Sequence, residues 1–535
     1  MKKISKILSL VFVLYSVFAL SGCITKTNTT QNKRKTEELV LSDDKYRNYY
    51  EIFVYSFYDS NGDGYGDLNG VTQKLDYVKE MGFNGIWLMP INNASSYHGY
   101  DVTNYLSIDS KYGTEENFVN LLNAAHSKGI NVIMDLVINH TSINHPWFQE
   151  AARYIRTNGK PGGTYGNYYN FSKSSLSGYS KLPDTDYYYE AQFWSGMPDL
   201  NLDSSTVKNE IVNIMAHWLN LGVDGFRLDA VTSYYTNYTQ NNVEFLDWLY
   251  KEAKKIKPSV YMVGEAWLNL DTQVRKYYDS GVDSFFLFPS AQASGSTVKA
   301  LAINRSNNGQ LFGNLLKTQE TTYDIGIMAP FLSNHDTDRA QTFIGRTTNN
   351  KVKMAQGLIS LMKGAMFVYY GEEIGMSSPV SNSDPSKRVA ILWDTKESEG
   401  YCTRSPEGLY VNPDTYYSNG SVKEQVENND SILNYYKYST YIRNANPEIA
   451  RGTTQVFESY YEQSPYVCVF TRTYGGKTIT IVVNLSYENE VSITLNQDEL
   501  GFDKMTHYLC ANYEDDVTYS DGTLKLPPYS YAIFR

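Results

Sequence analysis

Gly225-Phe-Arg-Leu-Asp-Ala-Val231 is a short, mainly apolar run with charged residues toward its carboxyl end. Such a run is typical of a buried strand in a parallel sheet. Seven similar runs lie at residues 51–58, 85–90, 131–139, 260–266, 284–289, 330–335 and 366–371. Stretches with helical periodicity separate them. Eight strands alternating with amphipathic helices predict a closed (β/α)₈ barrel, and the lack of a glycine fingerprint after the first run argues against a doubly wound dinucleotide-binding sheet.

Two parts of the chain do not follow this alternation. Residues 141–200, rich in Tyr, Gly, Ser and Asn, are too many for a structureless loop and predict a small domain inserted after the third strand. After the helix-like stretch 431–445, alternating runs are divided by turns. They predict a C-terminal antiparallel β-sandwich domain at 450–535, which leaves 46–449 for the barrel and its insertion.

The N-terminus has the pattern of an export signal. Three lysines in the first six residues precede an apolar stretch that is short for a membrane span. It ends in Leu20-Ser-Gly-Cys23, which resembles a bacterial lipobox and implies cleavage before Cys23 and lipidation of its thiol. An ordinary secretory signal with an incidental cysteine is the alternative. We therefore expect a signal peptide at 1–22, a polar tether at 23–45, and an extracytoplasmic protein that meets the cell membrane only through this lipid.

Composition narrows the class of partner. The chain carries 47 Lys and Arg against 58 Asp and Glu, a net charge of −11, with no basic stripe, so a nucleic-acid partner is not expected. Beyond Cys23 only Cys402, Cys468 and Cys510 remain, which allows at most one internal bridge. Cys468 and Cys510 could pair, but a fold with so few cysteines does not depend on disulfides.

Charged side chains gather where the predicted strands end. They are Asp135, His140, Arg227, Asp229, Glu265, His335 and Asp336. Barrel enzymes place their active sites at the carboxyl ends of the strands. A single acid there is usually a cap or a salt-bridge partner. Several acids with an arginine and two histidines on one face need a functional reason, because buried charges are costly.

Cleavage of a glycosidic bond supplies such a reason. Retaining hydrolysis uses an ionised carboxylate as nucleophile and a protonated carboxyl as acid, about 5 Å apart. Asp229 and Glu265 lie on neighbouring predicted strands, which are ~4.8 Å apart. Arg227, two residues before Asp229, faces the same side and would pair with its negative charge. Glu265 has the more apolar neighbours, which favour a raised pKa and the acid role.

Four segments resemble the signature regions of the α-amylase family of glycoside hydrolases and occur in that family's order. They are Asp135-Leu-Val-Ile-Asn-His140, Gly225-Phe-Arg-Leu-Asp-Ala-Val231, Val263-Gly-Glu-Ala-Trp267 and Phe331-Leu-Ser-Asn-His-Asp336. The resemblance implies that Asp229 is the nucleophile, Glu265 the general acid/base and Asp336 the stabiliser of the transition state. It also implies that the sugar at the cleavage subsite is bound by His140, Arg227 and His335.

Two further segments extend the resemblance. Tyr97-His-Gly-Tyr-Asp101 is similar to the family segment in which a histidine contacts, and a tyrosine stacks on, the same sugar. It adds His98, Tyr100 and Asp101 to the expected substrate-binding residues, with a plain surface turn as the alternative. Met197-Pro-Asp-Leu-Asn201 resembles a fifth family region, in a form intermediate between oligo-1,6-glucosidases and neopullulanases. That form is typical of a group that includes bacterial lipoprotein α-amylases.

Oxygen-bearing residues alternate along Asp59-Ser-Asn-Gly-Asp-Gly-Tyr-Gly-Asp67. This spacing suits a hard cation and predicts one structural Ca²⁺ site. We expect no organic cofactor. The expected ligands are Asp59, Asn61, Asp63, Tyr65 and Asp67. The segment resembles the calcium loop of oligo-1,6-glucosidase relatives, and an Asx-rich turn is the alternative. Thr232-Ser-Tyr234 stands where many family members carry Lys-His, which argues against a second calcium site that would use Asn139.

The resulting hypothesis is a monomeric enzyme that hydrolyses α-1,4 bonds in starch, maltodextrins and related α-glucans with retention. In the family a valine directly after the nucleophile accompanies α-1,6 specificity, so Ala230 favours α-1,4 cleavage. An α-glucosidase, oligo-1,6-glucosidase or transglycosylase of the same family is an alternative. A non-catalytic glucan-binding surface lipoprotein is an alternative of another class. The loss of a catalytic carboxylate would favour it, and this sequence keeps all three.

Overall fold

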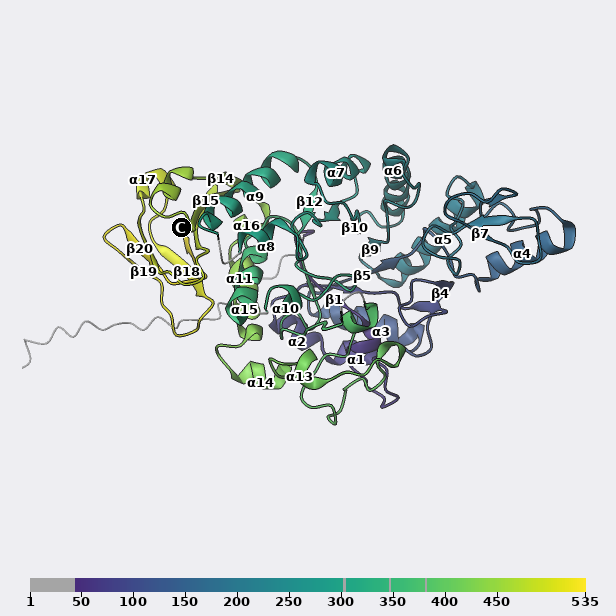
Figure 1. Ribbon diagram of the computed structural model, residues 1–535, viewed down its shortest axis with the longest axis horizontal. Helices are drawn as coiled ribbons and strands as arrows, with labels where there is room; N and C mark the ends of the chain where they lie inside the picture. The colour runs from purple at the N-terminus through teal and green to yellow at the C-terminus, as the bar shows by residue number, and fades with distance from the viewer. Residues whose placement is uncertain (1–43, 302–304, 346–347, 381–382) are drawn as a thin grey trace, which may run out of the picture. The chain divides into compact units, whose positions relative to one another are not determined.

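One parallel eight-stranded sheet forms in the computed structural model (Figure 1), with the order β12-β11-β10-β9-β5-β2-β1-β13. Its strands are β1 Asn48–Ile52, β2 Gly85–Leu88, β5 Asn131–Leu136, β9 Gly225–Leu228, β10 Tyr261–Gly264, β11 Ser284–Phe286, β12 Ile327–Ala329 and β13 Met366–Tyr369. Seven of these strands overlap the predicted runs, whereas the predicted run 330–335 lies directly after strand β12 and not on it. The amides of Ala365 and Phe367 donate to the carbonyls of Met328 and Pro330, which joins the two ends of the sheet. The (β/α)₈ barrel is therefore confirmed.

The structure describes residues 44–301, 305–345, 348–380 and 383–535, and all of these belong to one compact unit, Thr36–Arg535. The predicted signal peptide, Cys23 and all but the last two residues of the predicted tether lie outside the described residues. Within the described ranges, no helix is long and apolar enough to cross a membrane.

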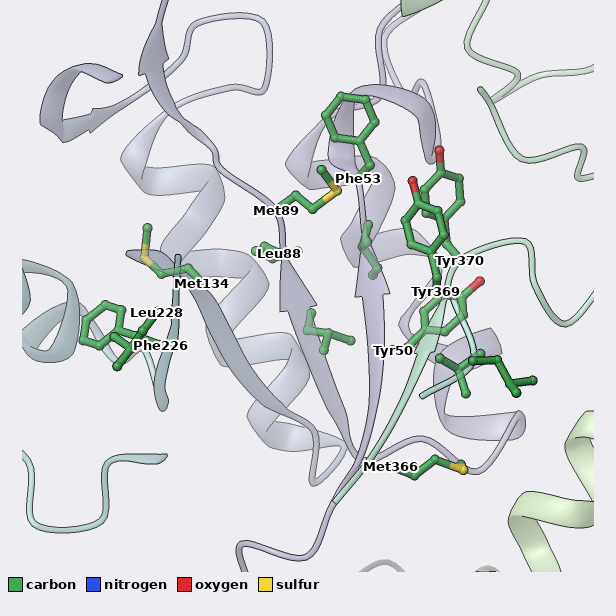
Figure 2. Close-up of a cluster of buried hydrophobic side chains, with 14 of the residues drawn as sticks. Tyr50, Phe53, Leu88, Met89, Met134, Phe226, Leu228, Met366, Tyr369 and Tyr370 are labelled. Carbon is green, nitrogen blue, oxygen red and sulfur yellow. The ribbon is translucent and has the colours of Figure 1, made fainter. Parts of the chain in front are cut away.

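Side chains along each barrel strand alternate between two hydrophobic clusters. Tyr49 belongs to the cluster inside the barrel, where its ring stacks between those of Tyr261 and Phe367 at centroid distances of 5.3 and 4.8 Å. The next residue, Tyr50, belongs to the cluster between strands and helices, which Figure 2 shows together with Phe226 and Leu228. Because alternate residues of a strand face opposite sides, the odd-numbered positions of β9 point into the barrel.

Helices follow the strands and cover the outer cluster with apolar stripes. The thirteen-residue α3 begins with a capping box between Thr114 and Asn117 and buries Phe118 and Leu121 among others. The helices of this part of the chain are α1 Leu68–Gln73, α2 Leu75–Glu80, α3 Glu115–Ser127, α5 Ser205–Leu221, α6 Thr239–Ile256, α7 Asp271–Arg275, α8 Ser296–Ala300, α9 Asn308–Thr322, α10 Ala340–Phe343, α11 Asn349–Ser360, α12 Asp384–Lys387, α13 Pro413–Tyr416, α14 Val422–Glu427, α15 Ile432–Ala445 and α16 Pro447–Arg451.

Residues 141–200 hold structure of their own, as a long insertion requires. They contain helix α4 (Pro146–Asn158) and a three-stranded antiparallel sheet, β6-β8-β7, at Phe171–Ser172, Tyr188–Glu190 and Tyr179–Lys181. A bridge between His140 and Asp199 pairs the two ends of the insertion. A two-stranded ribbon, β3 Asn92–Ala94 with β4 Val102–Ile108, follows strand β2.

The C-terminal residues form two antiparallel sheets that share one hydrophobic core, as predicted. The larger sheet has the order β14-β15-β16-β21-β18, at Thr453–Val456, Val467–Tyr474, Lys477–Asn484, Ser530–Phe534 and Met505–Cys510. The smaller sheet has the order β17-β20-β19, at Val491–Thr494, Thr523–Leu526 and Thr518–Ser520. The short helix α17 spans Gln497–Leu500.

The possible bridge between Cys468 and Cys510 does not form. Cys468 lies on β15 and Cys510 on β18, and strands β16 and β21 separate them. The two side chains also contribute to different hydrophobic clusters. Three strand spacings are about 14 Å, far beyond the reach of a disulfide. The described cysteines are buried thiols.

Candidate active site

Charged side chains converge at the carboxyl ends of the strands inside the barrel. Asp229 follows β9 directly and Glu265 follows β10, while Asp336 lies in the loop after β12. The outward-facing Phe226 and Leu228 of β9 leave Arg227 and Asp229 pointing inward. The fold therefore brings together the three acids that the sequence singled out.

One buried guanidinium links three of the carboxylates. Arg227 Nη1 is 2.6 Å from Asp135 Oδ1 and 2.5 Å from Asp229 Oδ1. Its Nη2 is 2.8 Å from Glu265 Oε1. The Arg227 side chain is almost fully buried, so these contacts are shielded from solvent. Asp229 and Glu265 are thus held side by side on adjacent strands, as a retaining pair requires.

Glu265 is the carboxyl best suited to carry a proton. Burial raises its pKa to about 7, and the negative charges of Asp229 and Asp336 add to this effect against the opposing charge of Arg227. A carboxyl with this pKa is partly protonated near neutral pH and can act as a general acid.

Asp336 is held in the opposite state. Burial alone would raise its pKa, but the charges of His335 and Arg388 outweigh burial and keep the pKa well below its usual range. Arg388 Nη2 lies 2.7 Å from Asp336 Oδ1, and His335 Nε2 lies 2.9 Å from Oδ2. Asp336 therefore stays negative throughout the physiological range.

His335 lies between two carboxylates. Its Nδ1 is 2.6 Å from Glu51 Oε1, on the strand β1 side, and its Nε2 faces Asp336. Burial opposes the charged imidazole, but Asp336 and Glu51 together raise the pKa of His335 to about 9. The imidazolium form is therefore favoured at neutral pH.

The segment 97–101 packs against this group. The Tyr100 ring stacks on His335 with a centroid distance of 5.4 Å, and the Tyr100 hydroxyl donates to Asp135 Oδ2 at 3.3 Å. The Tyr100 amide donates to His98 Nδ1 at 3.1 Å, which places the two rings 6.0 Å apart. Asp101 is buried, and its Oδ1 accepts from the amide and hydroxyl of Ser96, so it supports this turn.

His140 completes the set of predicted residues. Its Nε2 is 3.1 Å from the Tyr100 carbonyl and donates to it, while burial lowers the pKa of His140 and keeps the ring neutral. Phe193 from the insertion meets the His140 ring edge-on at 5.3 Å and is half-exposed, as is its neighbour Trp194. Half-exposed aromatic rings beside an acidic site are suited to stacking on sugars.

The comparisons with known proteins agree with this geometry. Residues 51–452 match the family model described as the catalytic domain of alpha amylase. The chain belongs to the α-amylase family of glycoside hydrolases. It is 37% identical to Alpha-amylase 3 of Dictyoglomus thermophilum over 84% of this chain and 86% of that protein. It is 28% identical to the oligo-1,6-glucosidase of Parageobacillus thermoglucosidasius over 91% and 97%.

A solved structure matches across nearly the whole fold. Eubacterium rectale Amy13B is 42% identical, with a TM-score of 0.87 over 93% of this chain and 96% of that one. Because the chain belongs to this family, the protein is a glycoside hydrolase that acts on α-glucans.

Three residues of this α-amylase-family site were not predicted. Glu51 pairs with His335, Trp87 Nε1 donates to Asp135 Oδ2 at 3.0 Å, and Arg388 pairs with Asp336. A charged residue inside the apolar run of β1 was a usable signal for Glu51. Arg388 lies in an irregular loop after β13, where no periodic pattern distinguishes it.

The predicted calcium loop has a well-defined backbone. Asp59 Oδ1 accepts from the amides of Asn61 and Gly62, and its Oδ2 accepts from Gly64. Asn61 and Asp63 each accept from the amide two residues on, which winds the loop into successive Asx turns. Asp67 accepts from Ser60 and caps α1 through the amide of Gly70, so it is already committed as a helix cap.

This donor set is compatible with Ca²⁺, although the described residues contain no preformed cluster of three or more metal-binding His, Cys, Asp or Glu side chains. Burial raises the pKa of the Cys402 thiol, and Asp59, Asp67 and Asp63 lie near enough to this thiol for their negative charges to raise its pKa further. Among the described residues, none of the three forms a salt bridge. The loop thus concentrates carboxylate oxygens without a salt bridge in the described part of the chain, although the Arg404 side chain packs beside it, with its guanidinium 5.4 Å from the centre of the Tyr65 ring.

Proposed function

We propose that this enzyme hydrolyses α-1,4-glucosidic bonds in starch, maltodextrins and related glucans with retention of configuration. The observation that carries the proposal is the Arg227 bridge between Asp229 and Glu265, two carboxyl groups on adjacent strands. The raised pKa of Glu265 supports a division of roles, with Asp229 as nucleophile and Glu265 as acid.

In the first step Glu265 gives its proton to the glycosidic oxygen. An oxygen of Asp229 bonds to the anomeric carbon as the bond to the leaving sugar breaks. In the second step the Glu265 carboxylate takes a proton from water, whose oxygen displaces Asp229 from the same carbon. Two inversions restore the original configuration, and both carboxyl groups return to their starting states.

Asp336 and the residues around it would stabilise the positive charge that develops on the sugar in the transition state of each step. Its carboxylate is kept negative by His335 and Arg388, so it needs no rearrangement when the charge appears. Tyr100, stacked on His335, offers a flat ring next to the reacting sugar. His98 flanks Tyr100 and would hydrogen-bond a sugar hydroxyl through Nε2, because its Nδ1 accepts from the Tyr100 amide. Both ring nitrogens of His140 have protein partners, so His140 would hold the Tyr100 segment beside the sugar.

Two observations support α-1,4 specificity. Ala230, rather than valine, follows the nucleophile. The relative at 37% identity is named an α-amylase. The alternative of α-1,6 cleavage is favoured by the oligo-1,6-glucosidase relative, which aligns over 97% of its own length.

The test is product analysis with the full chain in mild detergent on amylose, pullulan, isomaltose and maltotriose. We expect maltooligosaccharides from amylose, released first as α-anomers by NMR, and no products from Asp229→Asn. Cleavage of isomaltose with amylose left intact would replace this proposal with the α-1,6-glucosidase. Glucan binding without turnover of any substrate would mean that the barrel serves for capture only.

We further propose that the loop 59–67 binds a structural Ca²⁺. We also propose that a lipid on Cys23 anchors the enzyme to the membrane outside the cytoplasm, and that the enzyme is a monomer. The alternating oxygens of the loop and the Leu20-Ser-Gly-Cys23 segment support these proposals. Fractionation of cells that express wild type and Cys23→Ser tests the anchor. Wild type should follow the membrane and Cys23→Ser should not, and equal distribution would reject the lipid anchor.

A further inference from the structure

The backbone turn directly after Asp229 touches the neighbouring acid. Strand β9 ends at Leu228, and Ala230 has a φ of 45°, one of seven positive values among the described non-glycine residues. The left-handed conformation is uncommon for a residue with a Cβ and is typically retained where it has a purpose. Here it turns the chain out of the strand at the peptide whose amide faces β10.

That amide donates to the general acid. Ala230 N lies 3.0 Å from Glu265 Oε2, while Glu265 Oε1 faces Arg227 Nη2 at 2.8 Å. The Ala230 amide is thus the hydrogen-bond donor to the buried carboxyl, because Oε1 forms an ion pair with Arg227 but accepts no hydrogen bond from the described residues. Both partners come from strand β9 and its turn. The Ser233 amide donates to the Ala230 carbonyl at 2.8 Å and closes the turn that holds this arrangement.

We infer that Ala230 is a positioning residue, whose left-handed turn aims its amide at Glu265 Oε2 and so sets the orientation and acidity of the catalytic acid. The inference rests on the proposed role of Glu265. Burial raises the pKa of Glu265. Because a hydrogen bond to a carboxylate favours the charged form, the Ala230 amide would oppose that rise. A β-branched residue is strongly disfavoured at this φ, so it would displace the turn and the amide with it.

The decisive variant removes only the amide hydrogen. Replacing Ala230 with lactate by nonsense suppression in the full chain converts the amide to an ester and keeps the methyl group. The basic limb of kcat/KM against pH, measured on maltotriose, should move to higher pH by about one unit. An ester at Val231, which replaces a neighbouring amide not bonded to Glu265, is the matched control and should leave the limb in place.

Two side-chain variants separate positioning from simple bulk. Ala230→Gly adopts a positive φ freely and keeps the amide, so its basic limb should match wild type within about 0.2 units. Ala230→Val should shift the limb in the same direction as the ester. α-Maltosyl fluoride, whose leaving group needs no protonation, should be cleaved by the ester variant at close to the wild-type rate.

The outcomes distinguish this inference from the proposed function. If Glu265→Gln keeps wild-type activity and its basic limb, Glu265 is not the acid and the proposed mechanism is wrong. If Glu265→Gln loses the limb while the Ala230 ester leaves it unmoved, only the positioning role is overturned. If all Ala230 variants are less active but the basic limb of kcat/KM against pH stays in place, Ala230 has only a structural role and the positioning role is likewise overturned.

Discussion

At the scale of single residues, the acid–base chemistry depends on the protonation of Glu265. Its pKa of about 7 in the buried site means that the protonated fraction falls as the pH rises through neutrality. We therefore expect kcat/KM on maltooligosaccharides to decline above about pH 7, tenfold for each further unit. Glu265→Gln should abolish this dependence and most activity, yet retain cleavage of α-maltosyl fluoride. A pH–rate profile with no limb near pH 7 would contradict the assignment.

Arg388 is one of the site residues that the sequence did not predict. Its Nη2 holds Asp336 at 2.7 Å and its Nε donates to the His335 carbonyl at 3.1 Å. We expect Arg388→Gln to lower kcat about 10²-fold with a smaller effect on KM, because the stabilising carboxylate is misplaced in the transition state. Arg388→Lys keeps the positive charge but loses the planar guanidinium with its several donors, so its kcat should lie between those of wild type and Arg388→Gln. Wild-type kcat in Arg388→Gln would show that Asp336 is placed without it.

At the scale of elements, the sequence located the strands better than their ends. The run 330–335 was expected as the seventh strand, but β12 is Ile327–Ala329. The run 51–58 was expected as the first, but β1 ends at Ile52 and a 3-10 turn at Val54–Ser56 follows. In both places the chain leaves the sheet early while its residues stay apolar and buried, so hydrophobicity marked burial and not strand pairing.

Strand periodicity predicted only part of the site: Glu51 and Trp87 were missed although they lie on strands β1 and β2, and the role of the loop residue Asp336 was predicted through the family resemblance. Asp229 and Glu265 follow apolar runs, and the period of two placed Arg227 on the same side as Asp229. Arg388 gave neither signal, because it reaches Asp336 from 52 positions along the chain and lies in no segment that resembles a family region. The positive φ of Ala230 was equally hidden, because alanine carries no mark of a left-handed turn, unlike glycine or asparagine.

The turn that follows β13 carries a buried acid whose ionisation acts on stability. Glu372 accepts from the hydroxyls of Ser333 and Tyr436, and burial raises its pKa to about 8. From about pH 4.5 to 8 the unfolded chain has lost this proton while the folded chain keeps it. The free energy of unfolding therefore falls as the pH rises through this window, because the folded state binds more protons.

Glu372→Gln removes the loss of stability at high pH, because glutamine does not ionise. Its side-chain amide can still form hydrogen bonds with the Ser333 and Tyr436 hydroxyls. We expect its Tm to exceed that of wild type by a few degrees at pH 8, and the difference to vanish near pH 4.5. Exposed Glu488 gives the matched control, since Glu488→Gln should leave Tm unchanged at both pH values. A lower Tm for Glu372→Gln at pH 8 would mean that the ionised carboxylate is the stabilising form.

At the scale of the whole molecule, the loop 59–67 joins segments distant in sequence. The Asp59 amide donates to the Gly400 carbonyl, and the Arg404 amide donates to the Gly64 carbonyl. Ordering this loop therefore also orders the long segment after strand β13. A cation that neutralised Asp59, Asp63 and Asp67 would stabilise both segments at once, which makes the stability of the fold a sensitive measure of its presence.

We expect chelation with EDTA to lower Tm by several degrees and added Ca²⁺ to restore it, with Mg²⁺ less effective because the loop is irregular and rich in carboxylate and carbonyl oxygens. Asp59→Asn removes a charge at the buried start of the loop and should make Tm independent of both reagents. Asp186→Asn, at an exposed position of the insertion, should respond like wild type. A wild-type Tm that EDTA leaves unchanged would assign the loop to a self-sufficient series of Asx turns, since its backbone hydrogen bonds already satisfy Asp59 and Asp67.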